Sequence, residues 1–218
     1  RPRRTPNKKE IAISVILIIF FSIFVVINIG LNLFGETSTD ISGRLSTEDS
    51  RLLGHLPYPE ASKSDLVSIY PGLEVHKDTY KALDEMRSAA RAEGIDLVVL
   101  SGFRSHDLQE EIFFQVKSQR NQTAIQRAKV SAPPGYSEHS TGYAIDLGDY
   151  LKRDTDFSVS FEGTNSFKWL KKNAARFHFI LSFPRDNSQG VSYEPWHWRF
   201  EGTADALRAF EAARRLSE

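Results

Sequence analysis

The feature that most constrains this chain is an uncharged apolar run near its N-terminus. Residues 11–34 (IAISVILIIFFSIFVVINIGLNLF) are 24 consecutive residues without a charged side chain. A helix of that length spans about 36 Å at about 1.5 Å per residue, enough to cross the roughly 30 Å apolar core of a bilayer. The run is longer than a signal-peptide core, and the residues after it make a poor cleavage site. We therefore predict an uncleaved transmembrane anchor over residues 11–34, with a cleaved signal peptide or a buried core helix as the alternatives.

The charges on the two sides of this run differ in sign. Of the 28 basic and 28 acidic residues, five basic residues and one acid lie in residues 1–10, which gives this flank a net charge of +4. The part from residue 35 onward has a net charge of −4. Basic flanks stay on the cytoplasmic side, so we expect a single-pass protein of the cell membrane with its bulk on the outer, extracytoplasmic side. The balanced total removes the main argument for nucleic-acid binding, and no obligate protein partner is evident.

The remainder divides into a linker and one folded region. Residues 35–62 are rich in Ser, Thr, Gly and acids, which predicts a flexible stalk. Residues 63–218 have the length of a single domain. Their hydrophobic spacing predicts helices and strands in no regular alternation, which indicates the α+β class. The expected strands are residues 96–100, 144–147, 179–182 and 196–200, and the expected helices are residues 80–90, a segment capped by Ser105, residues 167–177 and residues 204–216.

Two histidines stand in motifs that suggest metal chemistry. The chain has no cysteine, which excludes thiolate ligands and a thiol nucleophile. His139 lies in SEHSTGYAID, which ends at Asp146, and His197 lies in EPWHW. Two imidazoles and one carboxylate leave zinc a fourth position for water, and Glu194 could serve as the base for that water. Because Pro195 argues against a helix, Glu194 is expected on a turn entering a strand. The alternative to a metal site is that the His and Trp side chains of these motifs only pack in the protein interior.

Four ordered motifs extend this pattern. They are SGFRSHDLQ at residues 101–109, SAPPGYSEHSTGYAID at 131–146, WLKKNAARF at 169–177 and YEPWHWRF at 193–200. Together they resemble the VanY-type D-alanyl-D-alanine carboxypeptidases over roughly residues 70–202. These zinc peptidases belong with the L,D-carboxypeptidases and share a metal-site architecture with lysostaphin-like peptidases and the hedgehog domain. The resemblance implies a single zinc peptidase domain with a small antiparallel sheet flanked by helices, here preceded by the transmembrane helix.

The resemblance also implies a role for each motif residue. The zinc ligands would be His139, Asp146 and His197, with Glu194 as general base. Arg104 would steady the substrate and the oxyanion, and Gln109 and Ser137 would help to hold the terminal carboxylate of the peptide.

The activity implied is that of a zinc metallo-carboxypeptidase. It would remove the terminal D-alanine from peptidoglycan stem pentapeptides. The alternatives are an L,D-carboxypeptidase that trims tetrapeptide stems and a non-catalytic cell-wall-binding module. His178 departs from the family, since many relatives have glycine there, and we expect a surface or packed side chain rather than a fourth ligand. Glu138 could form a hydrogen bond to one of the metal ligands without itself binding the metal, or it could be an ordinary exposed acid.

Overall fold

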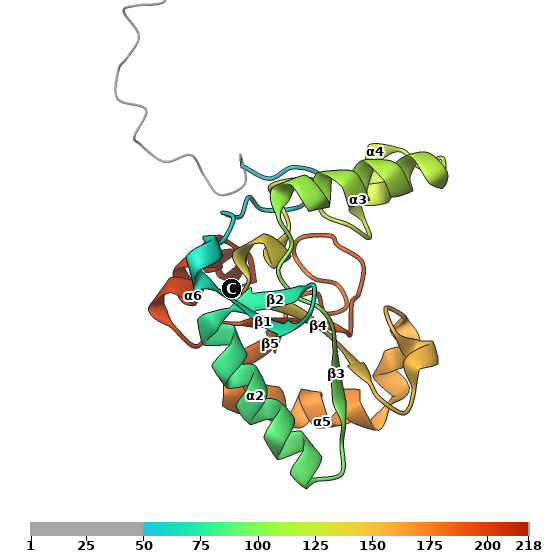
Figure 1. The fold of residues 1–218 in the computed structure, drawn as a ribbon. Coiled ribbons are helices and arrows are strands. Elements are labelled where there is room, and N and C mark those ends of the chain that lie inside the picture. Colours follow the sequence, from blue (N-terminus) through green and yellow to red (C-terminus); the bar gives the residue numbers. More distant parts are fainter. Residues whose placement is uncertain (1–49, 218) are drawn as a thin grey trace, which may run out of the picture. The chain divides into compact units, whose positions relative to one another are not determined.

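The computed structural model describes residues 50–217, which form an α+β domain (Figure 1). Two antiparallel sheets carry its strands, one with β1 and β2 and the other in the order β3-β4-β6-β5. The strands are β1 (Leu66–Tyr70), β2 (Leu73–His76), β3 (Leu97–Ser101), β4 (Ala144–Asp149), β5 (Phe179–Leu181) and β6 (His197–Phe200). The α-helices are α2 (Lys77–Ala92), α3 (His106–Gln119), α4 (Ala124–Ala128), α5 (Asn165–Asn173), α6 (Ala204–Ala209) and α7 (Glu211–Ser217). Five short 3₁₀ helices lie between them: η1 (Lys63–Asp65), η2 (Glu138–Thr141), η3 (Arg153–Thr155), η4 (Val159–Gly163) and η5 (Ala174–Phe177). The predicted fold class and small antiparallel sheet are confirmed.

Strand alternation separates a core face of the larger sheet from a polar face. Ile145 and Leu147 of β4 and Trp198 and Phe200 of β6 belong to the hydrophobic core, where α2 and α5 also pack. Successive side chains of a strand point to opposite faces. Asp146 of β4 and His197 and Arg199 of β6, all buried and polar, therefore lie together on the other face of the sheet.

The end of α2 and the start of α3, on either side of β3, agree with the sequence predictions. α2 turns Leu83, Met86 and Ala90 into the core, and it stops just before Gly94, whose φ of 76° few other residues tolerate. The side chain of Ser105 accepts a hydrogen bond from the amide of Leu108 and caps α3, as expected. In Figure 1, α3 and α4 lie together at the end of the domain away from α2 and α5.

The C-terminal segment is two helices, so the prediction of one continuous helix over residues 204–216 is wrong. Phe210 ends α6 and is fully buried, and its ring lies 5.6 Å from that of Tyr58 and 6.4 Å from that of Tyr143. The break coincides with this buried ring, and helical spacing alone does not show such an interruption.

The described end of the expected stalk is part of the domain. Leu56 is fully buried and Tyr58 is 5% exposed. The amide of Tyr58 donates to the carbonyl of Gly135, and the amide of Ala61 donates to that of Ser140. The expectation of a flexible stalk therefore fails for residues 50–62, because apolar side chains spaced too sparsely to form a pattern still fill gaps in the core.

The predictions for the basic flank, for the anchor over residues 11–34 and for the first part of the stalk lie outside the described residues. Among residues 50–217, no helix combines the length and apolarity that crossing a membrane requires.

Candidate metal centre and active site

Sheet register and one short turn bring three expected ligands together. Asp146 of β4 and His197 of β6 are directly opposite partners in the antiparallel pair, so their side chains share a face. His139 reaches them from η2, which ends at Gly142 with a φ of 70°. One ligand atom from each of the three residues can be chosen so that all lie within 4.8 Å of one another, and all three residues are buried.

The remaining nitrogen of each imidazole has its own partner. Nδ1 of His139 lies 2.7 Å from the carbonyl of Gly102, which leaves Nε2 facing Asp146 Oδ2 at 3.2 Å. Nδ1 of His197 lies 3.1 Å from Asp146 Oδ1, and its Nε2 lies 2.9 Å from Glu138 Oε2. Histidine ligands of metals are held in this way, with the second nitrogen donating to a carbonyl or carboxylate. The donor set and its supporting groups therefore fit a metal ion bound by His139 Nε2, Asp146 and His197 Nδ1, the nitrogen and oxygen ligands that zinc uses.

Glu138 links His197 to a buried ionic network. Its Oε1 accepts hydrogen bonds from Arg199 Nη1 at 3.1 Å and from the Tyr58 hydroxyl at 3.3 Å. Arg199 also donates to Glu201 at 2.8 Å. Glu138 is only 3% exposed, which excludes the reading of an ordinary exposed acid. Glu138 is a contact partner of the candidate ligand His197.

Burial and the charges within this cluster shift the pKa of each of its members. Burial disfavours the ionised carboxyl of Glu138, but Arg199 and His197 outweigh this cost and lower its pKa to about 2. Burial likewise opposes ionisation of Asp146, and His139 and His197 lower its pKa nevertheless. Burial lowers the pKa of His139, which favours the neutral imidazole that a metal requires. Burial would also lower the pKa of His197, but its two carboxylate partners raise it to about 10.

Glu194 lies beside the ligands on the expected turn. Its carbonyl accepts a hydrogen bond from the amide of His197, the first residue of β6, at 3.1 Å. Burial, with Asp146 and Glu138 adding repulsion, raises the pKa of Glu194 to about 7 against the attraction of His197 and Arg104. A carboxyl group with such a pKa can both accept and donate a proton near neutral pH.

Arg104 and Gln109 form a supported pair. Nη1 of Arg104 donates to Gln109 Oε1 at 2.8 Å, and Nη2 donates to Ser101 Oγ at 3.1 Å. Gln109 is fully buried, and its amide nitrogen donates to Ala132 O at 2.6 Å and to Ser131 Oγ at 3.2 Å. Both ends of the Gln109 amide are thus engaged. Gln109 positions Arg104 in this structure, and the contact with substrate expected from its motif stays a prediction.

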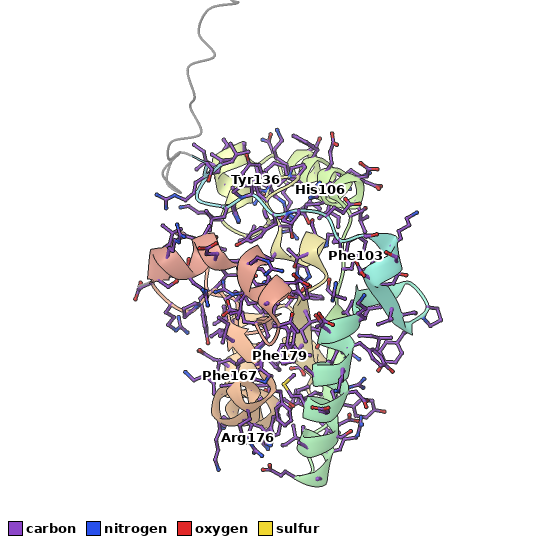
Figure 2. The ribbon with its side chains drawn as sticks, turned by 90° about the vertical axis from the view of Figure 1, so that its left-hand side faces the viewer. Phe103, His106, Tyr136, Phe167, Arg176 and Phe179 are labelled. Carbon is purple, nitrogen blue, oxygen red and sulfur yellow. The ribbon has the colours of Figure 1, made fainter. Side chains whose placement is uncertain are left out.

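One pocket of about 430 Å³ brings these groups to a common space. Its wall includes the three ligands, Glu194, Arg104 and Ser137, together with aromatic side chains such as Phe183 and Trp196. Tyr136, another residue of the wall, lies at the end of the domain formed by α3 and α4 (Figure 2). Gln109 does not line the pocket, and every other expected site residue does.

His178 lies apart from this pocket, so it is not a fourth ligand. It is exposed and caps η5 with a φ of 62°, in the left-handed region. That conformation explains physically why glycine suits the position.

Sequence reasoning left the Glu138–Arg199 network undetermined. Arg199 falls within the last motif, two residues after His197, and strand alternation would have placed the two side chains on one face. Its pairing with Glu138 joins residues 61 positions apart.

Comparison with known proteins agrees with this geometry. The sequence matches the family described as VanY, D-alanyl-D-alanine carboxypeptidase, over residues 72–203. The chain belongs to the VanY family. A D-alanyl-D-alanine carboxypeptidase of Enterococcus faecalis is 30% identical over 171 residues, which are 74% of this chain and 61% of that protein.

Two solved structures share the fold. The vancomycin-resistance D,D-pentapeptidase VanY, a crystal structure in complex with Zn(II), superposes with a TM-score of 0.58 at 27% identity, covering 75% of this chain and 94% of that one. The LD-carboxypeptidase LdcB gives a TM-score of 0.57 at 30% identity and covers 74% of this chain and 73% of that one. The chain spans about half to three fifths of the length of the curated VanY relatives it matches.

Proposed function

We propose that this protein is a zinc-dependent D-alanyl-D-alanine carboxypeptidase that removes the terminal D-alanine from peptidoglycan stem pentapeptides. The observation that carries this proposal is the placement of Glu194 and Arg104 in one pocket with His139, Asp146 and His197. A base and a cation beside a three-ligand site are the groups that hydrolysis of a peptide bond requires. Membership of the VanY family supports the same activity.

Zinc is the proposed metal because the donor set has two imidazoles, one carboxylate and no thiolate. The chemistry that a zinc ion supplies at such a site is Lewis-acid polarisation of a carbonyl and activation of a water molecule. The protein's own groups would complete the reaction. Gly102 and Glu138 hold the two histidine rings in the orientation that ligation needs.

Glu194 and Arg104 would have separate tasks. The Glu194 carboxylate would accept a proton from the attacking water and then deliver it to the nitrogen of the departing D-alanine. Its pKa of about 7 suits both transfers near neutral pH. The Arg104 guanidinium, held by Gln109 and Ser101, would stabilise the negative charge that develops on the scissile carbonyl oxygen.

The decisive experiment separates metal binding from turnover. Glu194→Gln should keep one zinc ion per chain and lose at least about 100-fold in kcat for release of D-alanine from the pentapeptide. Glu85→Gln, which changes an exposed acid of α2, is the matched control and should behave as the wild type. Substantial turnover by Glu194→Gln would refute the assignment of the base.

The second candidate is an L,D-carboxypeptidase that trims tetrapeptide stems. The similarity to LdcB, with a TM-score of 0.57 against 0.58 for VanY, supports this second candidate. The enzyme should be offered pentapeptide and tetrapeptide stems separately and the products weighed by mass spectrometry. Release of D-alanine from the pentapeptide alone would support the first proposal, and release from the tetrapeptide alone would support the second.

A non-catalytic wall-binding module is a weaker candidate. A module that only binds has no use for a carboxyl group placed beside a metal site with a pKa of about 7. A zinc-loaded protein that binds stem peptides and hydrolyses none of them would favour this alternative.

For the location of the protein, we propose that residues 11–34 anchor it in the cell membrane with the domain on the outer side. The uncharged run and its flank of net charge +4 support this. The full chain should stay with membranes after alkaline carbonate washing, and protease added outside spheroplasts should digest the domain. Release of the full chain by the wash, or protection from protease, would contradict the proposal.

A further inference from the structure

The end of the domain that α3 and α4 form has a long stretch of sequence without an acid. Residues 112–137 contain two lysines, two arginines and no aspartate or glutamate, whereas the chain from residue 35 onward has a net charge of −4. Arg120 and Lys129 are exposed and Lys117 is half-buried. The exposed ion pairs among residues 50–217 all involve other side chains. This end therefore carries positive charge that no neighbouring acid offsets.

Large apolar side chains are exposed on the same elements. Ile125 of α4 is 64% exposed, Phe114 of α3 is 47% exposed, and Val130, just after α4, is 46% exposed. The ammonium group of Lys117 lies 5.6 Å from the centre of the Phe114 ring. Apolar side chains mixed with cations are the composition of surfaces that bind at the headgroup region of a membrane.

A tight turn adds two leucines to this end. Leu52 is 43% exposed and Leu53 is 41% exposed. Leu53 has a φ of 53°, in the left-handed region that bulky residues rarely adopt. The turn is attached to α4, because Nε2 of His55 lies 2.7 Å from the carbonyl of Ala128, and Figure 1 shows the first described residues beside α3 and α4. A strained turn thus presents two apolar side chains where surface loops are usually polar.

The place of this turn in the chain brings it near the proposed anchor. Fifteen residues, 35–49, separate the uncharged run from the first described residue. Even fully extended, they would span at most about 50–55 Å. A surface joined to a membrane by so short a linker meets lipid at a high effective concentration, so weak contacts are enough to hold it there.

We propose that the α3–α4 end, together with the Leu52–Leu53 turn, docks on anionic lipid of the membrane that anchors the chain. Its basic residues would meet lipid phosphates, and its exposed apolar side chains would enter the boundary between headgroups and acyl chains. These apolar side chains favour lipid over a soluble anionic polymer, which would gain nothing from them. Arg120 and Val130 also line the active-site pocket, so docking would keep that pocket close to the membrane surface.

Docking can be measured by fluorescence on the full chain in lipid nanodiscs. Because the chain has no cysteine, Ser118→Cys in α3 and Ser88→Cys in α2 each create a single attachment site for a dye. Both positions are exposed, and they lie toward opposite ends of the domain. The discs contain zwitterionic lipid alone or mixed with anionic phosphatidylglycerol, and nitroxide-labelled lipid quenches a dye at close range. We expect quenching at position 118 in the anionic discs and none at position 88 in either disc.

A pair of lysine substitutions tests the contribution of charge. Each basic residue near an anionic surface strengthens binding by about fivefold. Lys117→Gln with Lys129→Gln should therefore lower the ratio of docked to free domain by about 25-fold in anionic discs. Lys81→Gln with Lys171→Gln removes the same charge from exposed positions of α2 and α5 and should change the ratio by less than about twofold. An unchanged ratio in the first pair overturns the proposal.

The leucine turn has a variant of its own. Asparagine tolerates the left-handed conformation, so Leu53→Asn should keep the melting temperature and lower docking by about 5- to 10-fold. Unchanged docking in this variant would show that the turn has only a structural role and would remove it from the proposed surface. If Leu53→Asn lowers the melting temperature, the lysine variants decide the question, because they alter side chains outside the core.

The remaining outcomes separate docking from the other proposals. Equal quenching at the two positions, or quenching at position 118 that needs no anionic lipid, overturns docking. If the full chain does not enter the discs, the proposed anchor fails; sedimentation of the chain with anionic vesicles, lost in the first lysine pair, then supports docking, and its absence overturns it. Binding to soluble polyglycerol phosphate without quenching at position 118 assigns this end to an anionic polymer and overturns docking on lipid.

The inference goes beyond the proposed activity and does not depend on it. Release of D-alanine from a soluble pentapeptide should be the same in both lysine pairs and in the wild type. A chain that docks and releases no D-alanine would refute the proposed function alone. A chain that releases D-alanine and shows no quenching at position 118 would refute docking alone.

Discussion

Replacing Glu138 by glutamine tests the physical account of the metal centre most directly. Glu138 is buried, lies 2.9 Å from His197 Nε2 and accepts a hydrogen bond from Arg199. Glutamine keeps the size of the side chain and removes its charge. The change should therefore lower the free energy of unfolding and weaken the hydrogen bond that orients the His197 ring. The two effects can be measured separately.

The magnitude follows from the pKa of Glu138. Arg199 and His197 overcome the cost of burial and hold this pKa at about 2, against an ordinary value of 4.5. Each pKa unit corresponds to about 1.4 kcal/mol, so the ionised carboxylate contributes about 3 kcal/mol to folding. Loss of one partner from a buried ion pair costs about 3–5 kcal/mol, which agrees. For a domain of this size the melting temperature should fall by about 6–12 °C.

The sign of the pH dependence is fixed by the same values. Because the folded-state pKa is lowered, the contribution of Glu138 is fully present above pH 4.5 and is lost as the pH falls toward 2. Urea unfolding of the wild type and Glu138→Gln should differ by about 3 kcal/mol at pH 7 and converge at low pH. A difference that stays constant between pH 7 and pH 3 would refute the electrostatic explanation.

Zinc affinity supplies the second readout. Loss of the group that orients a histidine ligand typically lowers metal affinity by about 10- to 100-fold, and chelator competition measures this. Glu201→Gln is the matched control, because Glu201 also pairs with Arg199 but has no contact with His197. It should lower stability and leave zinc affinity unchanged. Unchanged zinc affinity in Glu138→Gln would mean that Glu138 stabilises the fold only.

Two further predictions concern stability away from the metal centre. Burial lowers the pKa of His76, which accepts a hydrogen bond from the amide of Asp78 at the start of α2. The stability that depends on neutral His76 is present above pH 6.5 and is lost as the pH falls below it. The free energy of unfolding of the wild type should therefore fall between pH 7.5 and 5.5, and this fall should be smaller in His76→Asn. An equally steep fall in the variant would contradict the explanation. His178→Gly should raise the free energy of unfolding by about 1 kcal/mol, because glycine tolerates the left-handed φ of 62°. Urea titration measures this change. A decrease would mean that packing of the His178 ring on Phe200 matters more.

The sequence was informative where the physical cause is local. The apolar spacing of α2 and the cap at Ser105 depend on residues within a few positions of one another. It was uninformative where the cause is distant. Tyr58 is buried because its ring meets that of Phe210, and the same contact accompanies the break between α6 and α7. The hydrophobic spacing of neither segment predicts the contact between Tyr58 and Phe210.

The same division applies to the candidate site. Motifs predicted His139, Asp146, His197 and Glu194 as site residues, and the structure brings them together, because each motif places its residue at a strand or turn whose course is local. Gln109 shows the limit of this reasoning. Its motif position does not show that its amide contacts Arg104 and Ala132, because those contacts depend on the surrounding fold.

The turn at η2 explains why so short a motif can specify a metal site. His197 is held by Asp146 on one nitrogen and Glu138 on the other, while its ring meets the ring of His139 at 4.8 Å. Glu138 and His139 are adjacent, so one turn supplies both a ligand and the group that orients another. That turn can close only with glycine at position 142. Its φ is 70°, and a Cβ there would lie 2.9 Å from the amide nitrogen of His76. A substitution at Gly142 would therefore disturb His139 and the group that orients His197, two of the three candidate ligands, although the glycine itself contacts neither metal nor substrate in this account.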